Sequence, residues 1–137
     1  MNKGKQNSDE SLVELRNLTI RFGRQTVLNN INLRAKKGET IAVIGESGCG
    51  KTVLMKTIIR LISPTEGEVF FDGQDLSKTN ERELTAQRMR FGFVFQAAAL
   101  FDSMTVFQNI AFALRQHQIS DRAEIRRRVE KRLAEVG

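Results

Sequence analysis

The residues that most constrain this chain are 45–52, which read GESGCGKT. They follow an apolar run at residues 40–44, which is typical of a strand, and they precede residues 53–61, whose apolar positions fall at helical spacing. The pattern G-x-x-x-x-G-K-[ST] between a strand and a helix is that of a phosphate-binding loop. Its glycines let successive backbone N–H groups turn toward phosphate oxygens, and the N-terminus of the helix adds partial positive charge. We therefore predict a nucleotide-binding protein.

Each residue of this loop is a candidate contact for the nucleotide. The Lys51 ammonium would reach the β- and γ-phosphates, and the Thr52 hydroxyl would be a ligand for Mg²⁺. We interpret Cys49 as a small residue that fills the loop rather than as a nucleophile. ATP and Mg²⁺ are thus the expected cofactors, and the nucleotide would be bound by Gly45, Glu46, Ser47, Gly48, Cys49, Gly50, Lys51 and Thr52.

Composition narrows the classes of protein that remain. The apolar stretches are far shorter than the roughly 18 residues that a membrane-spanning helix needs. Residues 1–10 are polar, which predicts a flexible tail and not a secretory signal. The single cysteine excludes an internal disulfide, so we expect a reducing, cytoplasmic setting.

The net charge of +6 raises the question of a nucleic-acid partner. Much of the excess lies in a late basic cluster whose apolar residues recur at helical spacing, so we place the cluster mostly on the solvated face of an amphipathic helix. No aromatic residue lies among these charges to stack on a base, and we expect no nucleic-acid partner. The cluster comprises Arg122, Arg126, Arg127, Arg128, Lys131 and Arg132, and the apolar stripe comprises Ile125, Val129, Leu133 and Val136.

The remaining patterns predict a mixed order of strands and helices. Alternation indicates strands at residues 12–22, with a break at residues 16–17, at residues 31–33, and at residues 67–71 before an Asp-Gly turn. Residues 91–95 form a further apolar strand candidate, and residues 79–88 are expected to be helical. Thr105 with Gln108, and Asp121 with Glu124, have the spacing of capping boxes that open two further helices.

Several of these segments resemble the ATP-binding subunit of an ABC transporter, over almost the whole chain from about Leu12. Residues 44–52 look like its Walker A loop, and PTEGEVFFDG at residues 64–73 is similar to a strand and turn of that family. FVFQ at residues 93–96 looks like the Q-loop. The resemblance implies that Gln96 touches the Mg²⁺ and the attacking water, so Lys51 and Gln96 are the expected catalytic residues. It also implies that Phe22 stacks on adenine.

Each of these matches has a simpler alternative. Phe22 could be an ordinary inward strand residue, and Gln96 could be a solvated residue at the end of a strand. His117 follows an amphipathic segment and is interpreted as a surface residue. The position of Phe22 before the phosphate loop, and that of Gln96 between a strand and the helices, favour the functional interpretation.

Within the family, residues 99–106 and 109–112 look like the branch that powers lipid transport with MCE-domain partners, including the maintenance-of-lipid-asymmetry type. The sequence departs from that pattern at Ala97, Ala98 and Ala113. The resemblance implies an integral membrane permease, a second ATPase subunit that dimerises on ATP binding, and an MCE-domain protein as partners. It also implies a peripheral location on the cytoplasmic face of the inner or plasma membrane.

We find no match in residues 1–137 to the family's LSGGQ-like signature or to its Walker B strand. We therefore expect an N-terminal portion of a P-loop NTPase of the ABC type, of class α/β, with an incomplete sheet and no hydrolysis by this chain alone. It would comprise the tail at residues 1–10, part of the ATPase core at residues 11–103, and the start of a helical subdomain at residues 104–137. The part of the core would contain an antiparallel β region and the Walker A strand–loop–helix. Three alternatives stay open: a P-loop small-molecule kinase, a non-catalytic nucleotide-binding fragment, and a DNA- or ribosome-associated ABC protein.

Overall fold

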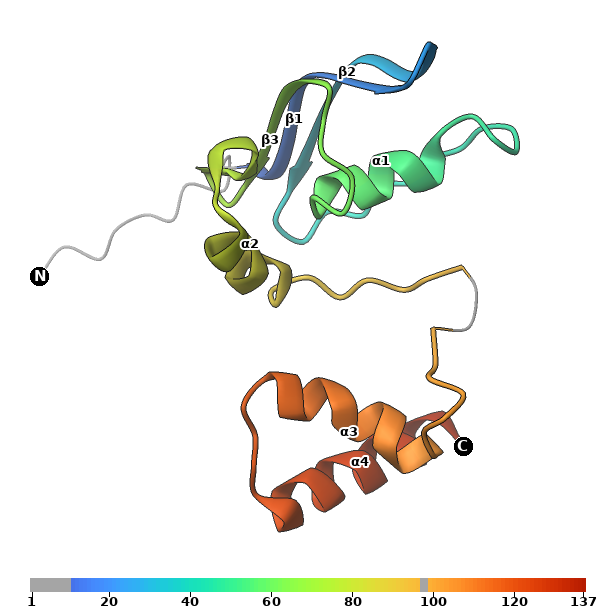
Figure 1. The fold of residues 1–137 in the computed structure, drawn as a ribbon, viewed down its shortest axis with the longest axis vertical. Coiled ribbons are helices and arrows are strands. Elements are labelled where there is room, and N and C mark those ends of the chain that lie inside the picture. Colours follow the sequence, from blue (N-terminus) through green and yellow to red (C-terminus); the bar gives the residue numbers. More distant parts are fainter. Residues whose placement is uncertain (1–10, 97–98) are drawn as a thin grey trace, which may run out of the picture. The chain divides into compact units, whose positions relative to one another are not determined.

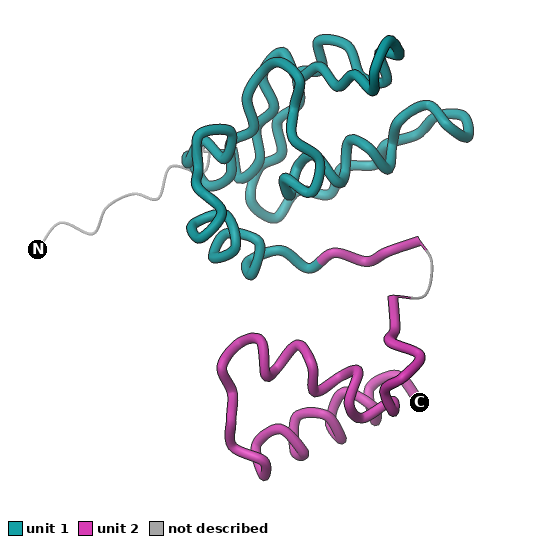
Figure 2. The backbone as a smooth tube through the Cα atoms, viewed as in Figure 1, with its two compact units in different colours: residues 1–92 teal, residues 93–137 magenta. Residues whose placement is uncertain are grey.

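The structure, a computed structural model, describes residues 11–96 and 99–137. The chain divides into two compact units, residues 1–92 and residues 93–137 (Figure 2). The tail predicted at residues 1–10, and the departure at Ala97 and Ala98, lie outside the described residues. The described part of the first unit contains a four-stranded antiparallel sheet, in the order β2 (Gln25–Lys36), β1 (Ser11–Phe22), β3 (Glu66–Phe71) and β4 (Gln74–Asp75) (Figure 1).

Strands β1 (Ser11–Phe22) and β2 (Gln25–Lys36) form a long hairpin. The register of β1 shifts after Leu15 against β2 and after Arg16 against β3, and Asn17 adopts a left-handed φ of 48°. The break predicted at residues 16–17 is therefore confirmed as a bulge. β3 (Glu66–Phe71) lies close to this bulge, because a Cβ on Gly67 would lie 2.4 Å from the Asn17 carbonyl oxygen. Glycine is required at that position.

The predicted Asp-Gly turn joins β3 to the short strand β4 (Gln74–Asp75). Asp72 and Gly73 have φ values of 51° and 78°, the two left-handed residues of a type I′ turn. A 3₁₀ turn, η1 (Leu76–Lys78), follows, and helix α2 (Glu81–Arg88) begins after Asn80, whose side chain accepts from the Glu83 N–H. The expected helix at residues 79–88 is thus confirmed, with its cap at Asn80.

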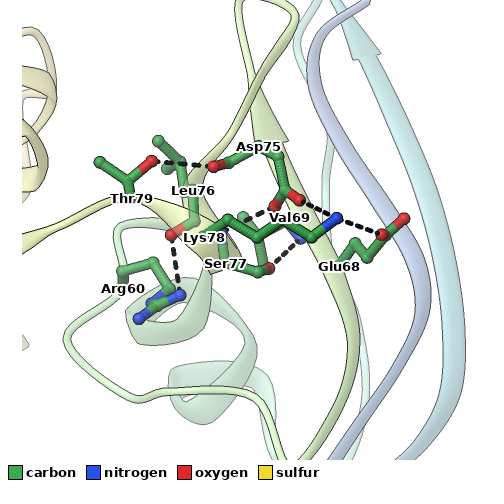
Figure 3. Close-up of polar contacts among 8 residues, drawn as sticks. All are labelled: Arg60, Glu68, Val69, Asp75, Leu76, Ser77, Lys78 and Thr79. Carbon is green, nitrogen blue, oxygen red and sulfur yellow. Dashed lines mark hydrogen bonds and ion pairs between the residues drawn. The ribbon is translucent and has the colours of Figure 1, made fainter.

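Polar contacts tie η1 to its neighbours, as Figure 3 shows. The Val69 N–H donates to Ser77 Oγ at 3.0 Å, and Lys78 Nζ lies 3.0 Å from Asp75 Oδ2. Arg60, which follows helix α1 (Lys51–Ile58), donates from Nη1 to the Leu76 carbonyl oxygen at 2.8 Å. Through these bonds η1 connects the C-terminal end of α1 to strand β3.

One hydrophobic core holds the first unit together. Alternate residues of β1 pack with side chains from β2, α1, β3, η1 and α2, so the helices lie over one face of the sheet. Burying such a side chain stabilises the fold by about 1.5–3 kcal/mol each. The buried set is Leu15, Leu18, Ile20, Leu28, Leu54, Val69, Phe71, Leu76 and Leu84.

Two predicted strands are wrong in this structure. Residues 40–44 and 91–95 are not assigned to strands, and neither segment belongs to the four-stranded sheet. Ile44 and Val94, apolar residues that a strand in the core would bury, are each 92% exposed. A strand exists only when a neighbouring strand accepts and donates its backbone hydrogen bonds, and no described segment does so for these two.

The second unit contains α3 (Val106–Gln116) and α4 (Arg122–Val136), packed around Ala111, Ile125 and Val129. The capping box of Thr105 and Gln108 is confirmed, since each side chain bonds the other residue's backbone N–H.

The last helix differs from its prediction in two places. Asp121 accepts from the Ala123 N–H, but Glu124 does not return a bond to Asp121. Glu124 instead accepts from Arg128 and Arg127, which lower its pKa. Three residues of the predicted apolar stripe pack against α3, whereas Val136 is 83% exposed because α3 does not extend to cover it.

Candidate nucleotide-binding site

The phosphate loop enters helix α1 through two glycines in left-handed conformations. Gly48 has a φ of 81°, and Gly50, the N-cap of α1, has a φ of 97°. No side chain caps the helix, so the N–H groups of its first turn are left for another acceptor. An uncapped helix N-terminus behind a glycine turn is the arrangement that binds phosphate groups.

The close packing of the loop explains two of its glycines. A Cβ on Gly45 would lie 2.7 Å from Cys49 Sγ, across the loop. Gly50 is buried against β2, where a Cβ would lie 3.0 Å from Leu28 Cδ2 and 3.3 Å from the Val27 carbonyl oxygen. The loop is therefore narrow, and the start of α1 is held directly against the β1–β2 hairpin.

Lys51 folds back over the loop. Its Nζ donates to the Gly45 and Glu46 carbonyl oxygens at 2.8 and 2.7 Å and lies 3.6 Å from Cys49 Sγ. This places the ammonium group beside the backbone turn, which is where a phosphate on the helix N-terminus would meet it. The contact with Cys49 is compatible with the predicted filler role of that residue.

The rest of the loop is open to solvent. Residues 45–49 and Thr52 are exposed, including the side chains of Glu46 and Ser47. The Thr52 hydroxyl has no protein partner within the described part of the chain, so its oxygen is accessible in the first turn of α1. A hydroxyl oxygen is a hard donor of the kind that Mg²⁺ takes, and the position fits the predicted ligand role.

Phe22 ends β1 and is 50% exposed, so it is not an ordinary core residue. Leu28, which contacts Gly50, pairs across the hairpin with Ile20, two residues before Phe22. The aromatic ring and the phosphate loop therefore belong to the same end of the sheet. The stacking of Phe22 on adenine stays a prediction.

Gln96 lies in the second unit, where it is exposed, and its predicted contact with Mg²⁺ stays a prediction. His117 ends α3 and is exposed, as expected of a surface residue. In the described residues, no three His, Cys, Asp or Glu side chains gather in a group that could hold a metal ion. No described helix is long and apolar enough to cross a membrane.

Two polar groups escaped the sequence analysis because nothing local marks them. Glu14 is 8% exposed on the sheet face opposite Leu15 and accepts from Arg16 at 2.9 Å and Arg34 at 2.7 Å. Its hydrogen bond with Arg16, followed by that with Arg34, lowers the pKa of the carboxyl to about 2. Asn109 on α3 bonds the backbone of residues 101–105. The partner of Glu14 on the neighbouring strand, Arg34, is set by strand pairing, and the partners of Asn109 are set by the path of the turn before α3.

Comparison with known proteins identifies the family. The model of the ABC transporter family matches residues 28–137, which include the whole phosphate loop. The chain belongs to the ABC transporter family. The predicted resemblance to an ABC ATP-binding domain is confirmed at this level, and the small-molecule kinase alternative is set aside.

The relatives of this ABC chain differ in what they transport. It is 41% identical over 129 residues to the intermembrane phospholipid transport system ATP-binding protein MlaF of Haemophilus influenzae, covering 94% of this chain and 49% of MlaF. It is 39% identical over 129 residues to the Fe(3+) ions import ATP-binding protein FbpC of Escherichia coli O157:H7, covering 94% of this chain and 35% of FbpC. The chain thus spans about half, or less, of the length of these curated relatives.

The fold is also that of an ABC cassette. The structure matches the ATP-binding cassette MJ0796, solved as a dimer in a post-hydrolysis state bound to ADP and Pi, with a TM-score of 0.78 and 33% identity. The match covers 87% of this chain and 54% of that one. The predicted fold class, an ABC-type P-loop NTPase with an incomplete sheet, is confirmed.

Proposed function

We propose that this chain binds Mg·ATP at the phosphate loop, as part of the energy-coupling ATPase subunit of an ABC transporter. The observation that carries the proposal is the uncapped N-terminus of α1, reached through left-handed Gly48 and Gly50, with the Lys51 ammonium folded over the same turn. Backbone N–H groups would bind the phosphate oxygens, and Lys51 would exchange its carbonyl contacts for the terminal phosphates.

The exposed Thr52 hydroxyl would hold Mg²⁺, whose positive charge would offset the negative charge that develops in phosphoryl transfer. Gln96 would orient the attacking water, and Phe22 would stack on the adenine ring. Hydrolysis would require a second ATPase subunit that closes on the bound ATP. The location proposed for the whole protein is the cytoplasmic face of the inner or plasma membrane, beside a permease.

Substitution of Lys51 tests nucleotide binding in the full-length protein. Lys51→Ala removes a charge-assisted contact worth about 1.5–3 kcal/mol, which corresponds to a loss of about tenfold to over a hundredfold in ATP affinity. Lys56→Ala, in the last turn of the same helix, is the matched control, because the Lys56 side chain has no partner in the described residues. Nucleotide titration should separate the two variants, and equal affinities would refute the assignment.

We further propose that the transported substrate is a lipid and that an MCE-domain protein belongs to the complex. The support is the pattern at residues 99–112 and the 41% identity to a phospholipid transport protein. Iron and sulfate import are competing substrate classes, since FbpC is 39% identical and a sulfate/thiosulfate import ATP-binding protein of Cucumis sativus is 42% identical. Transfer of labelled phospholipid between vesicles by the reconstituted complex, dependent on ATP and on Lys51, tests the proposal. ATP-dependent uptake of Fe³⁺ without phospholipid transfer would refute it.

The permease is proposed to dock on the segment that follows Gln96. Leu100 and Phe101 are 67% and 48% exposed, although apolar, and the Phe101 ring lies 5.0 Å from the Phe112 ring, centroid to centroid. Met104 is half-buried and contributes less to this surface. Exposed aromatic anchors held by a neighbouring ring are typical of residues that dominate binding energy.

Phe101→Asp in the full-length protein tests the docking surface. The variant should keep its ATP affinity and lose the permease on purification, because a carboxylate at an apolar contact must be desolvated without a partner. Arg115→Ala, an exposed change on α3, serves as the control. If the Phe101→Asp variant still co-purifies with the permease and supports transport, the docking proposal is wrong.

A further inference from the structure

Asn109 makes more side-chain hydrogen bonds to the backbone than any other described residue of the second unit. Its Oδ1 accepts from the Phe101 N–H at 2.8 Å. Its Nδ2 lies within hydrogen-bonding distance of the carbonyl oxygens of Phe101, Met104 and Thr105, at 3.2, 3.1 and 3.1 Å. One amide therefore contacts both ends of the turn that precedes α3.

The orientation of this amide follows from its surroundings. The nitrogen faces three carbonyl oxygens and the oxygen faces one N–H, so the reversed orientation would set the amide oxygen against three acceptors. The two N–H groups are shared among the three carbonyl oxygens. The Asn109 amide therefore holds the backbone of residues 101–105 in one conformation.

Apart from the bonds of Asn109, few hydrogen bonds hold the turn within the described residues. Residues 101–103 and Thr105 are exposed, and Met104 contributes one backbone bond, from its N–H to the Phe101 carbonyl oxygen at 3.0 Å. The capping box of Thr105 and Gln108 joins the end of the turn to α3 but does not reach Phe101. Only Asn109 connects Phe101 to the helix by hydrogen bonds within the described residues.

We infer that Asn109 is a positioning residue that makes the turn at residues 101–105 and helix α3 move as one body. The inference rests on the proposed function, because its consequence is that Phe101 and Phe112 are presented to the permease in a fixed arrangement. A displacement of either the turn or α3 is then transmitted to the other, since the two are joined by the hydrogen bonds of Asn109 and by the ring pair. Without Asn109, the ring pair of Phe101 and Phe112 would hold the turn against α3 with fewer contacts, and the affinity would fall by the cost of ordering the turn on binding.

The test uses the full-length protein in complex with its permease. Asn109→Ala removes all four contacts, whereas Asn109→Asp keeps an acceptor for the Phe101 N–H and places its other carboxylate oxygen against three carbonyl oxygens. Gln116→Ala, an exposed change in the last turn of α3, is the control. Three quantities are measured for each variant: amide hydrogen exchange of residues 99–105, ATP affinity, and permease-stimulated ATP hydrolysis.

For Asn109→Ala we expect exchange at the Phe101 amide to rise at least tenfold, while exchange within α3 and α4 and the ATP affinity stay unchanged. Permease-stimulated hydrolysis should fall at least fivefold, and Asn109→Asp should show both effects. Unchanged exchange would overturn the inference. Faster amide exchange at Phe101 with undiminished permease-stimulated ATP hydrolysis would also overturn it, because Asn109 would then only stabilise the turn.

Phe101→Asp separates this inference from the docking proposal on which it rests. If Phe101→Asp leaves permease binding intact, docking at this surface is wrong whatever Asn109 does. If Phe101→Asp abolishes permease binding while Asn109→Ala has no effect on exchange or stimulation, the surface is correct and the positioning role of Asn109 is wrong.

Discussion

Replacement of Gly67 by alanine should destabilise the protein far more than the same change at Gly73. Both glycines have left-handed φ values, 86° and 78°, so each substitution forces a Cβ into a conformation that costs about 1–2 kcal/mol for an L-residue. The difference lies in the surroundings. A Cβ on Gly67 would lie 2.4 and 2.5 Å from the carbonyl oxygens of Asn17 and Arg16, whereas nothing lies within 4 Å of a Cβ on Gly73.

The clash at Gly67 is with backbone atoms, which cannot rotate away as a side chain can. β3 must withdraw from the β1 bulge, and the overpacking adds about 1–3 kcal/mol to the conformational cost. We therefore expect Gly67→Ala to lower the free energy of unfolding by about 2–5 kcal/mol, and Gly73→Ala by only about 1–2 kcal/mol.

Urea unfolding of the full-length protein, followed by circular dichroism, measures both variants, and an unchanged m-value confirms that the transition itself is the same. Equal losses would refute the close contact between Gly67 and the bulge. If Gly73→Ala lowered the free energy of unfolding more than Gly67→Ala did, the left-handed φ of the type I′ turn could not be the only reason for glycine at residue 73.

Two further predictions follow from contacts in the first unit, and a third follows from the expectation that residues 1–137 contain neither the signature nor the Walker B strand. Because Arg16 and Arg34 lower the pKa of Glu14 to about 2, ionised Glu14 stabilises the fold above the pKa of the unfolded chain, and this stability is lost as the pH falls toward 2. Glu14→Gln should remove this contribution to the pH dependence of the free energy of unfolding between about pH 4.5 and pH 2. If the variant and the original protein showed the same pH dependence, the ion pairs of Glu14 with Arg16 and Arg34 would not stabilise the fold. Arg88 donates to the carbonyl oxygen of Ile59 at 3.0 Å and to the carbonyl oxygen of Arg60. Arg88→Ala should therefore lower the free energy of unfolding by about 1–3 kcal/mol. Arg82→Ala, at an exposed position on the same helix, is the control and should leave the free energy of unfolding unchanged. The chain of residues 1–137 by itself should not hydrolyse ATP, and sustained Mg²⁺-dependent phosphate release that Lys51→Ala abolishes would show that the catalytic groups have been misplaced.

Features that depend on a few neighbouring residues could be predicted from the sequence. The phosphate loop, the Asp72–Gly73 turn, the bulge at residues 16–17 and the capping box of Thr105 and Gln108 were each predicted and found. For the turn and the capping box, the required φ values and hydrogen bonds lie within about four residues, and the loop and the break in alternation are each marked by a short run of residues, so the residue types carry the information. The candidate nucleotide site was recognisable for the same reason.

Features that depend on distant partners could not be predicted in this way. The apolar runs at residues 40–44 and 91–95 have the composition of strands, yet they are not paired here, because pairing requires a second strand whose position no local pattern specifies. Val136 continued an apolar stripe but is exposed where α3 no longer covers it.

The amino-acid sequence by itself predicted the phosphate loop, because a short spacing of glycines, lysine and threonine defines that loop, and the matches at residues 64–73 and 93–96 indicated the family that the comparison confirmed. Only the tertiary structure decided the partners of Glu14, Gly67 and Asn109. The arginine opposite Glu14 is 20 residues away, and Gly67 must be glycine because of a bulge on another strand. Asn109 gains its role from a turn of backbone that its own helix brings within hydrogen-bonding distance. Such contacts arise from packing, where the position of one element is set by the others.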